Sequence, residues 1–191
     1  MTYELVVIGT SLGGLSAIKT LLKLLPSRFT AAIAIVQHRH RESNKALSSF
    51  LQQFTVLPVH EVEDKERIQP GNVYFAPADY HLLVETGYFS LSIDDPVSFA
   101  RPSIDVLLES AADAYAERAI GVILTGANQD GVQGLSALKA RGGLTIVQAP
   151  DTAESPVLPS AAIAAVEVDL VLPLSQIAPH LIHLCESSGG Q

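Results

Sequence analysis

Short apolar runs and longer amphipathic segments alternate along almost the whole chain. The apolar runs, such as those at 5–8 and 119–124, are continuous and rich in branched side chains, which is typical of strands buried on both faces. The segments between them place apolar residues at helical spacing. This alternation predicts an α/β fold with a doubly wound, mainly parallel sheet and helices on both faces.

One segment departs from this alternation. Two apolar runs flank Thr86 and Gly87, a pattern typical of an antiparallel β-hairpin inserted into the parallel arrangement. No linker, internal repeat or low-complexity tract divides the chain, so we expect one domain over residues 1–191. The expected strands are 5–8, 31–36, 56–62, 73–76, 81–85, 88–93, 119–124, 144–147 and 170–172, and the expected helices are 12–24, 45–54, 104–115, 132–140, 160–165 and 174–184.

Composition narrows the class of protein. A net charge of −8 and scattered basic residues argue against nucleic acid as a partner. The single cysteine, Cys185, excludes an intrachain disulfide and a zinc site built on cysteines. The chain shows neither a signal-peptide pattern nor an apolar run of bilayer length. We therefore expect a cytoplasmic protein without membrane insertion.

The turn after the first strand carries the most informative side chain, the hydroxyl of Ser11. In a doubly wound sheet this turn opens onto the crevice at the carboxyl ends of the strands, where the first N–H groups of the next helix also point. Gly9, Gly13 and Gly14 remove side chains that would block a tight turn or a close substrate. A hydroxyl among free N–H groups suits nucleophilic attack followed by oxyanion stabilisation.

The sequence leaves other interpretations of this loop open. Ser11 is also a favoured helix cap, a role that would stabilise the helix by about 1 kcal/mol. A dinucleotide-binding loop needs G-x-G-x-x-G, and the glycines at 9, 13 and 14 are spaced differently. A P-loop needs Gly-Lys-Ser/Thr, whereas Leu15 follows the last of these glycines.

Two further polar residues follow apolar strands, His38 after 31–36 and Asp130 after 119–124. If strand 5–8 lies between these two strands, Ser11 lies between the two side chains. His38 would then accept the serine proton and Asp130 would orient the imidazole, as in a serine hydrolase. His40 is the alternative base. Taken singly, His38 also fits a solvated loop residue, and Asp130 a turn or a helix cap.

The remaining ionisable residues fit simpler roles. Ser103 is expected to cap the helix that begins at residue 104, with Asp105 in its first turn. His81, together with the acidic residues near the hairpin, is expected at the surface. His60 is expected on an edge strand.

Five motifs occur in an order that resembles a known family. They are Gly-Thr-Ser-Leu-Gly-Gly (9–14), Val-Gln-His (36–38), Val-Tyr-Phe-Ala-Pro-Ala-Asp-Tyr-His-Leu (73–82), Arg-Pro-Ser-Ile-Asp-Val-Leu (101–107) and Val-Ile-Leu-Thr-Gly-Ala-Asn-Gln-Asp-Gly (122–131). From about residue 4 to residue 184, the chain resembles the catalytic domain of the CheB chemotaxis receptor methylesterases.

This resemblance implies hydrolysis of glutamate methyl esters on the cytoplasmic helices of chemoreceptors, and also deamidation of receptor glutamines. It implies Ser11 as nucleophile, His38 as base and Asp130 as its partner, with no metal or organic cofactor. Backbone N–H groups of Leu12 and Ala127 are the expected oxyanion donors. A catalytically quiet module that binds receptors or signalling partners, and a hydrolase for a different ester or amide, stay open as alternatives.

The chain departs from the family pattern at three places near the site. Leu12 replaces a threonine, His38-Arg39-His40 replaces His-Met-Pro, and Ala127-Asn128-Gln129 replaces the middle of Thr-Gly-Met-Gly-Asn-Asp-Gly. In that family a phosphoacceptor receiver domain usually precedes this domain, and we expect none within residues 1–191. We expect these changes to alter substrate fit and to leave the three catalytic side chains in place.

Overall fold

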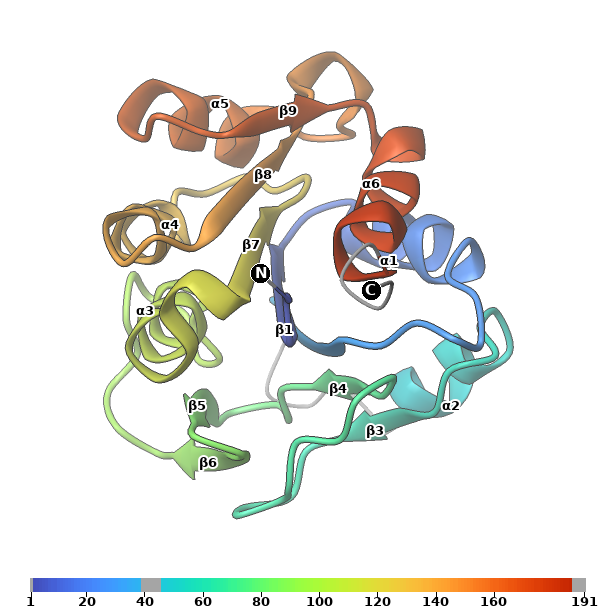
Figure 1. Ribbon diagram of the computed structural model, residues 1–191. Coiled ribbons are helices and arrows are strands. Elements are labelled where there is room, and N and C mark those ends of the chain that lie inside the picture. Colours follow the sequence, from blue (N-terminus) through green and yellow to red (C-terminus); the bar gives the residue numbers. More distant parts are fainter. Residues whose placement is uncertain (1, 39–45, 187–191) are drawn as a thin grey trace.

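The computed structural model describes residues 2–38 and 46–186, which form a parallel sheet covered by helices (Figure 1). Its seven strands lie in the order β3-β4-β2-β1-β7-β8-β9, and every neighbouring pair is parallel. These strands are β1 (Leu5–Thr10), β2 (Ala32–Gln37), β3 (Val59–Glu61), β4 (Val73–Phe75), β7 (Ala119–Ile123), β8 (Leu144–Gln148) and β9 (Leu170–Leu172). The predicted parallel sheet is therefore confirmed.

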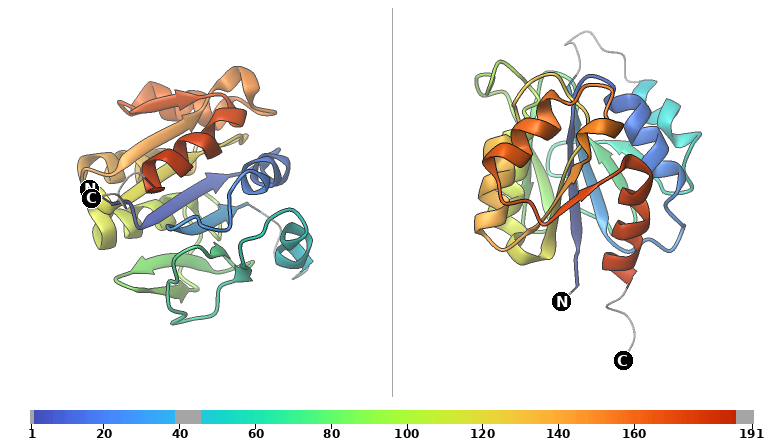
Figure 2. Two further views of the ribbon diagram at one scale, coloured as in Figure 1. Left: turned by 45° about the vertical axis from the view of Figure 1, so that its right-hand side comes forward. Right: turned by 90° about the horizontal axis from the view of Figure 1, so that it is seen from above.

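Helices cover both faces of the sheet, as the alternation of the sequence predicts. The helices are α1 (Gly14–Lys23), α2 (Ala46–Gln52), α3 (Ile104–Tyr115), α4 (Val132–Ala140), α5 (Val157–Ala165) and α6 (Leu174–Glu186). Seen from above, α3, α4 and α5 lie on one side of the strands, and α1 and α6 lie on the other (Figure 2).

The central strand shows why two apolar layers form. Successive side chains of a strand point to opposite faces, and every residue of β1 is buried. Val7 packs in the core cluster with α3 and α4, whereas Val6 and Ile8 pack in the cluster with α1 and α6. Burying both faces explains the unbroken apolar run in the sequence.

The predicted hairpin is also present. Strand β5 (His81–Glu85) pairs antiparallel with β6 (Tyr88–Ser92), and the turn between them holds Gly87 at a φ of 86°. Leu82, Val84 and Phe89 join the core cluster that contains α3. The hairpin therefore packs as a small second sheet beside the parallel one.

Several element boundaries differ from those predicted. Helix α1 begins at Gly14 rather than residue 12, because Gly13 has a φ of 79° in the left-handed region. Helix α5 begins at Val157 rather than residue 160, since Pro159 lies in its first turn, where proline is tolerated. Strand β3 is shorter than the predicted 56–62, beginning after Pro58.

The strand register places the loops that carry the polar residues. Thr10 pairs with Gln37 at the ends of β1 and β2, and Gly9 pairs with Ile123 at the end of β7. The residues that follow these strands therefore emerge side by side at one edge of the sheet. Within the described residues, no helix has the length and apolar character needed to cross a lipid bilayer.

Candidate active site

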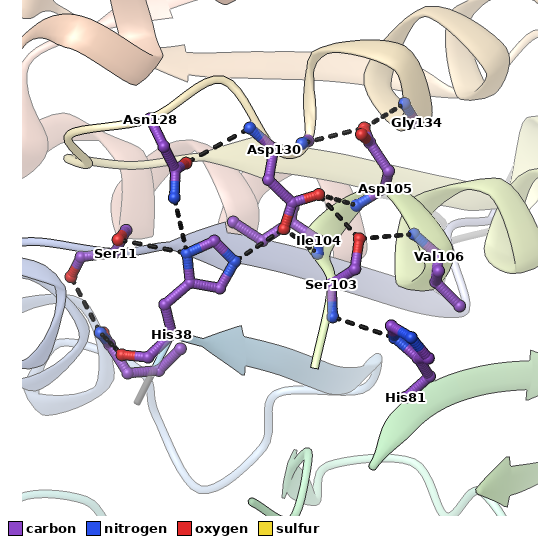
Figure 3. A network of polar contacts seen from close by, with 12 residues as sticks. Ser11, His38, His81, Ser103, Ile104, Asp105, Val106, Asn128, Asp130 and Gly134 are labelled. Carbon is purple, nitrogen blue, oxygen red and sulfur yellow. Dashed lines mark hydrogen bonds and ion pairs between the residues drawn. The ribbon is translucent and has the colours of Figure 1, made fainter. Parts of the chain in front are cut away.

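Ser11 lies on the tight turn between β1 and α1, directly after the last residue of the strand. Its Oγ atom is 3.2 Å from Nδ1 of His38 (Figure 3). The residue that caps α1 is Gly13, and no side chain donates or accepts a capping hydrogen bond there. The interpretation of Ser11 as a helix cap is therefore wrong, and its hydroxyl faces the histidine.

Close packing around the turn explains its glycines. A Cβ atom on Gly14 would lie 2.1 Å from Oε1 of Gln37, and one on Gly126 would lie 3.1 Å from Cβ of Ser11. Gln37 also ties the two loops together, because its Nε2 donates to the carbonyl oxygens of Ser11 (2.8 Å) and His38 (3.0 Å). The loops after β1 and β2 are thus held in contact.

The imidazole of His38 connects Ser11 with Asp130. Nε2 of His38 lies 2.6 Å from Oδ2 of Asp130. A carboxylate can only accept a hydrogen bond, so Nε2 carries the hydrogen. In the neutral ring this leaves the lone pair of Nδ1 directed toward Ser11. The structure therefore joins the three side chains that we singled out in the sequence into one hydrogen-bonded chain.

The first turn of α3 holds the Asp130 carboxylate in place. Oδ1 accepts hydrogen bonds from Ser103 Oγ (2.7 Å) and Asp105 N–H (3.0 Å), and Oδ2 accepts one from Ile104 N–H (2.7 Å). Burial by itself would raise the pKa of Asp130. The hydrogen bonds from His38, Ile104, Ser103 and Asp105 outweigh burial and hold the pKa below its ordinary value. The carboxylate stays ionised beside the imidazole.

A second buried carboxylate, Asp105, lies behind Asp130. Its Oδ1 accepts hydrogen bonds from the backbone N–H groups of Gly131 (2.9 Å) and Gly134 (2.8 Å). Burial raises the pKa of Asp105 to about 6, opposed by the Gly134 N–H and reinforced by the charge of Asp130. Asp105 thereby attaches the start of α4, and with it the Asp130 loop, to α3.

Sequence reasoning missed several contacts of this network. Ser103 caps α3 as predicted, accepting from Val106 N–H at 3.4 Å, but its bond to Asp130 was not foreseen. The surface position expected for His81 is wrong. The residue is 1% exposed, and its Nδ1 accepts the Ser103 N–H because the hairpin packs against the start of α3. Asn128, noted only as a departure from a motif, reaches His38 Nδ1 at 2.9 Å.

Some backbone N–H groups near Ser11 donate hydrogen bonds to other described residues, and others do not. Ser11 N–H donates to the Thr125 carbonyl (3.0 Å), and Gly126 N–H donates to the Ser155 carbonyl (3.1 Å). No hydrogen bond to any described residue involves the N–H of Leu12 or of Ala127. These two N–H groups, which we expect to be the oxyanion donors, can therefore donate to an oxygen atom of a bound substrate.

A cavity of about 650 Å³ opens beside Ser11. Its walls include the apolar side chains of Leu12, Leu15 and Phe50 and the charged side chains of Lys19 and Glu154. Among residues 2–38 and 46–186, no group of three or more histidine, cysteine, aspartate or glutamate side chains is arranged to hold a metal ion. His40, the alternative base, and Arg39 lie outside the described residues.

Comparison with known proteins reveals the family. The model of the CheB methylesterase domain matches residues 6–181. This chain belongs to the CheB methylesterase family. A relative from Leptospira interrogans is 48% identical over 98% of both chains. Protein-glutamate methylesterase/protein-glutamine glutaminase 1 of Carboxydothermus hydrogenoformans is 40% identical over 93% of this chain and 54% of its own length.

A solved CheB structure has the same fold. The crystal structure of the Thermotoga maritima CheB methylesterase catalytic domain superposes with a TM-score of 0.92 at 36% identity, covering 96% of this chain and all of that one. The resemblance to CheB catalytic domains and the predicted fold class are thus confirmed. The roles of Ser11, His38 and Asp130 stay predictions, because a shared fold does not by itself assign chemistry to side chains.

Proposed function

We propose that this chain is a protein-glutamate methylesterase that hydrolyses glutamyl γ-methyl esters on the cytoplasmic helices of chemoreceptors. The observation that carries the proposal is the continuous hydrogen-bonded chain from Ser11 through His38 to Asp130. The names of the relatives support the same reaction and add deamidation of glutamines. Chemotaxis signalling in the cytoplasm is the setting that such a substrate requires.

Acylation begins when Ser11 Oγ attacks the ester carbonyl carbon and its proton passes to His38 Nδ1. Asp130 stabilises the imidazolium that forms, since its carboxylate accepts the hydrogen bond from Nε2. The free N–H groups of Leu12 and Ala127 would face the negative oxygen of the tetrahedral intermediate. Its collapse breaks the bond to the methoxy oxygen, which takes the Nδ1 proton and leaves as methanol.

Deacylation repeats these steps with water. His38 Nδ1 accepts a proton from a water molecule as that water attacks the acyl-serine carbonyl, and the proton then returns to Ser11 Oγ. The products are a free glutamate side chain and the original enzyme. With a glutamine substrate, the first leaving group is ammonia in place of methanol, and the second half is identical.

The test measures methanol released from methylated receptor by the wild type and by Ser11→Ala. Ser16→Ala is the matched control, because Ser16 lines the same cavity but lies exposed on α1. We expect Ser11→Ala to lose at least about a thousandfold in rate, as is usual when a nucleophile is removed, and Ser16→Ala to keep the wild-type rate. Equal rates for Ser11→Ala and the wild type would overturn the proposal.

A receptor-binding module without catalysis would give a different result. It would bind methylated receptor with the same affinity in all three proteins and release no methanol from any of them. A hydrolase with another substrate would cleave small esters in a Ser11-dependent way and leave the receptor esters intact. The same set of proteins therefore separates all three functions.

A further inference from the structure

The base nitrogen of His38 has a second neighbour besides Ser11. Nδ2 of Asn128 lies 2.9 Å from His38 Nδ1, closer than the 3.2 Å that separates Nδ1 from Ser11 Oγ (Figure 3). The amide is oriented by its other end, because Oδ1 accepts the backbone N–H of Asp130 at 3.3 Å. The NH₂ group of Asn128 is therefore the end that faces the imidazole.

His38 Nδ1 cannot accept full hydrogen bonds from Ser11 and Asn128 at the same time. Nδ1 of a neutral imidazole has one lone pair, which Asn128 Nδ2–H and Ser11 Oγ–H both approach as donors. Once His38 has taken the serine proton, Nδ1 becomes a donor itself and can no longer accept from Asn128. The amide NH₂ group is released at the moment when the substrate carbonyl oxygen becomes negative.

The released donor lies near Ser11, the residue on which the tetrahedral intermediate would form. Asn128 Nδ2 and Ser11 Oγ contact the same nitrogen, and Asn128 directly follows Ala127, whose backbone N–H is free. A neutral amide held near a developing oxyanion stabilises the transition state more than the ground state.

We propose that the Asn128 side chain is a further catalytic residue, which donates a hydrogen bond to the tetrahedral oxyanion formed on Ser11. In the resting enzyme the same NH₂ group and the Ser11 hydroxyl share His38 Nδ1 as their acceptor. The inference rests on the proposed serine-hydrolase function. It adds a side-chain donor to the two backbone donors of Leu12 and Ala127.

The test compares Asn128→Ala with Gln129→Ala, a substitution of the exposed neighbour in the same loop. Two quantities are measured, kcat/KM for p-nitrophenyl acetate above the Ser11→Ala background, and the Kd of phenylboronic acid, which forms a tetrahedral adduct with an active serine. We expect Asn128→Ala to lose about 100- to 1000-fold in kcat/KM, the usual effect of removing one oxyanion donor. The Kd of the boronate should rise in the same variant, and Gln129→Ala should match the wild type in both.

Other results would overturn the inference. If Asn128→Ala hydrolyses the ester at the wild-type rate or faster and binds the boronate unchanged, the amide merely occupies the base in the resting state. If kcat/KM falls while the boronate Kd stays constant, the residue acts only through the structure of the loop. A wild type that cleaves neither p-nitrophenyl acetate nor receptor esters contradicts this inference and the proposed function together.

A different result is expected if only the proposed function is wrong and the Asn128 inference is right. In that case the wild type releases no methanol from methylated receptor, yet Asn128→Ala still lowers p-nitrophenyl acetate hydrolysis and boronate affinity. That outcome supports the Asn128 donor and rejects only the receptor ester as the substrate.

Discussion

The two ring nitrogens of His38 have different neighbours, and in the proposed mechanism this difference sets the direction of proton transfer. Nε2 faces the Asp130 carboxylate, whereas Nδ1 faces Ser11 and Asn128. Asp130 in turn accepts hydrogen bonds from Ser103 and from two backbone N–H groups of α3. The base is thus oriented through a network that begins at a helix N-terminus, where negative charge is favoured.

The buried carboxyl group of Asp105 predicts a pH-dependent contribution to stability. Burial raises the pKa of Asp105 to about 6, so the folded state binds its proton more tightly than the unfolded state. Stability from this group is therefore fully present below about pH 4 and is lost as the pH rises through about 6. At neutral pH the charged form costs on the order of 2–3 kcal/mol of folding free energy.

Asp105→Asn should remove this cost. The amide oxygen can still accept from Gly131 and Gly134, so we expect the variant to be more stable than the wild type by about 1–3 kcal/mol at pH 7.5. The difference should shrink to about 1 kcal/mol or less at pH 4.5. Urea unfolding of both proteins at the two pH values measures it. A difference of the same size at both pH values would show that the charge of Asp105 does not matter.

At the scale of elements, the site depends on close approach between β1, α3 and α4. Ile104 at the start of α3 is fully buried, and it fills the space that side chains at Gly9 and Gly131 would need. A Cβ on Gly131 would lie 2.6 Å from Cγ2 of Ile104. The backbone N–H of the same isoleucine donates to Asp130. Ile104 therefore both fills the space between these elements and helps to hold the Asp130 carboxylate in place.

Gly131→Ala should therefore damage both stability and activity. Gly131 has a φ of 112°, which L side chains rarely adopt, and the added methyl group would also displace Ile104. We expect a loss of about 2–4 kcal/mol in stability, because backbone strain and overpacking add, together with a marked fall in kcat/KM. Thermal unfolding and ester hydrolysis measure the two effects.

Gly87→Ala is the matched control for this prediction. Gly87 also has a positive φ, 86°, but no atom lies within 4 Å of an added Cβ. This variant should lose only about 1 kcal/mol, the cost of the backbone conformation, and keep full activity. Equal losses in the two variants would show that contact with Ile104 is unimportant.

The same scale shows what the sequence can and cannot predict. The apolar runs identify the parallel strands, and the carboxyl ends of parallel strands meet at one edge of a sheet. From this alone the sequence predicts that Ser11, His38 and Asp130, which follow three such strands, lie at the same edge. The burial of His81 and the contact of Asn128 with His38 depend on how the hairpin and the loop at 125–131 pack. Such contacts join segments that are far apart in the chain, and the hydrophobic periodicity of the sequence does not predict them.

At the scale of the whole molecule, Ser11 lies beside a cavity with a partly apolar wall. Leu15 is 40% exposed at this wall, although a buried position would stabilise such a side chain. A protein substrate can cover these side chains when a glutamyl ester reaches Ser11. The same contacts are unavailable to a small ester.

We therefore expect Leu15→Ser to separate the two kinds of substrate. The variant should lose about 5- to 30-fold in kcat/KM on methylated receptor, since one buried apolar side chain contributes about 1–2 kcal/mol at an interface. Its activity on p-nitrophenyl acetate should not change. Leu24→Ser is the control, because Leu24 is 47% exposed just beyond the last residue of the same helix, away from the cavity. An equal loss on both substrates would refute a role in receptor binding.

The most direct test of the central claim is chemical labelling of the nucleophile. A fluorophosphonate should modify the wild type once, with the adduct located on Ser11 by peptide mass spectrometry. His38→Ala should slow this labelling by about 100- to 10,000-fold, because the base that accepts the serine proton is gone. A label on another residue, or a Ser11 label that forms as fast without His38, would contradict the proton relay.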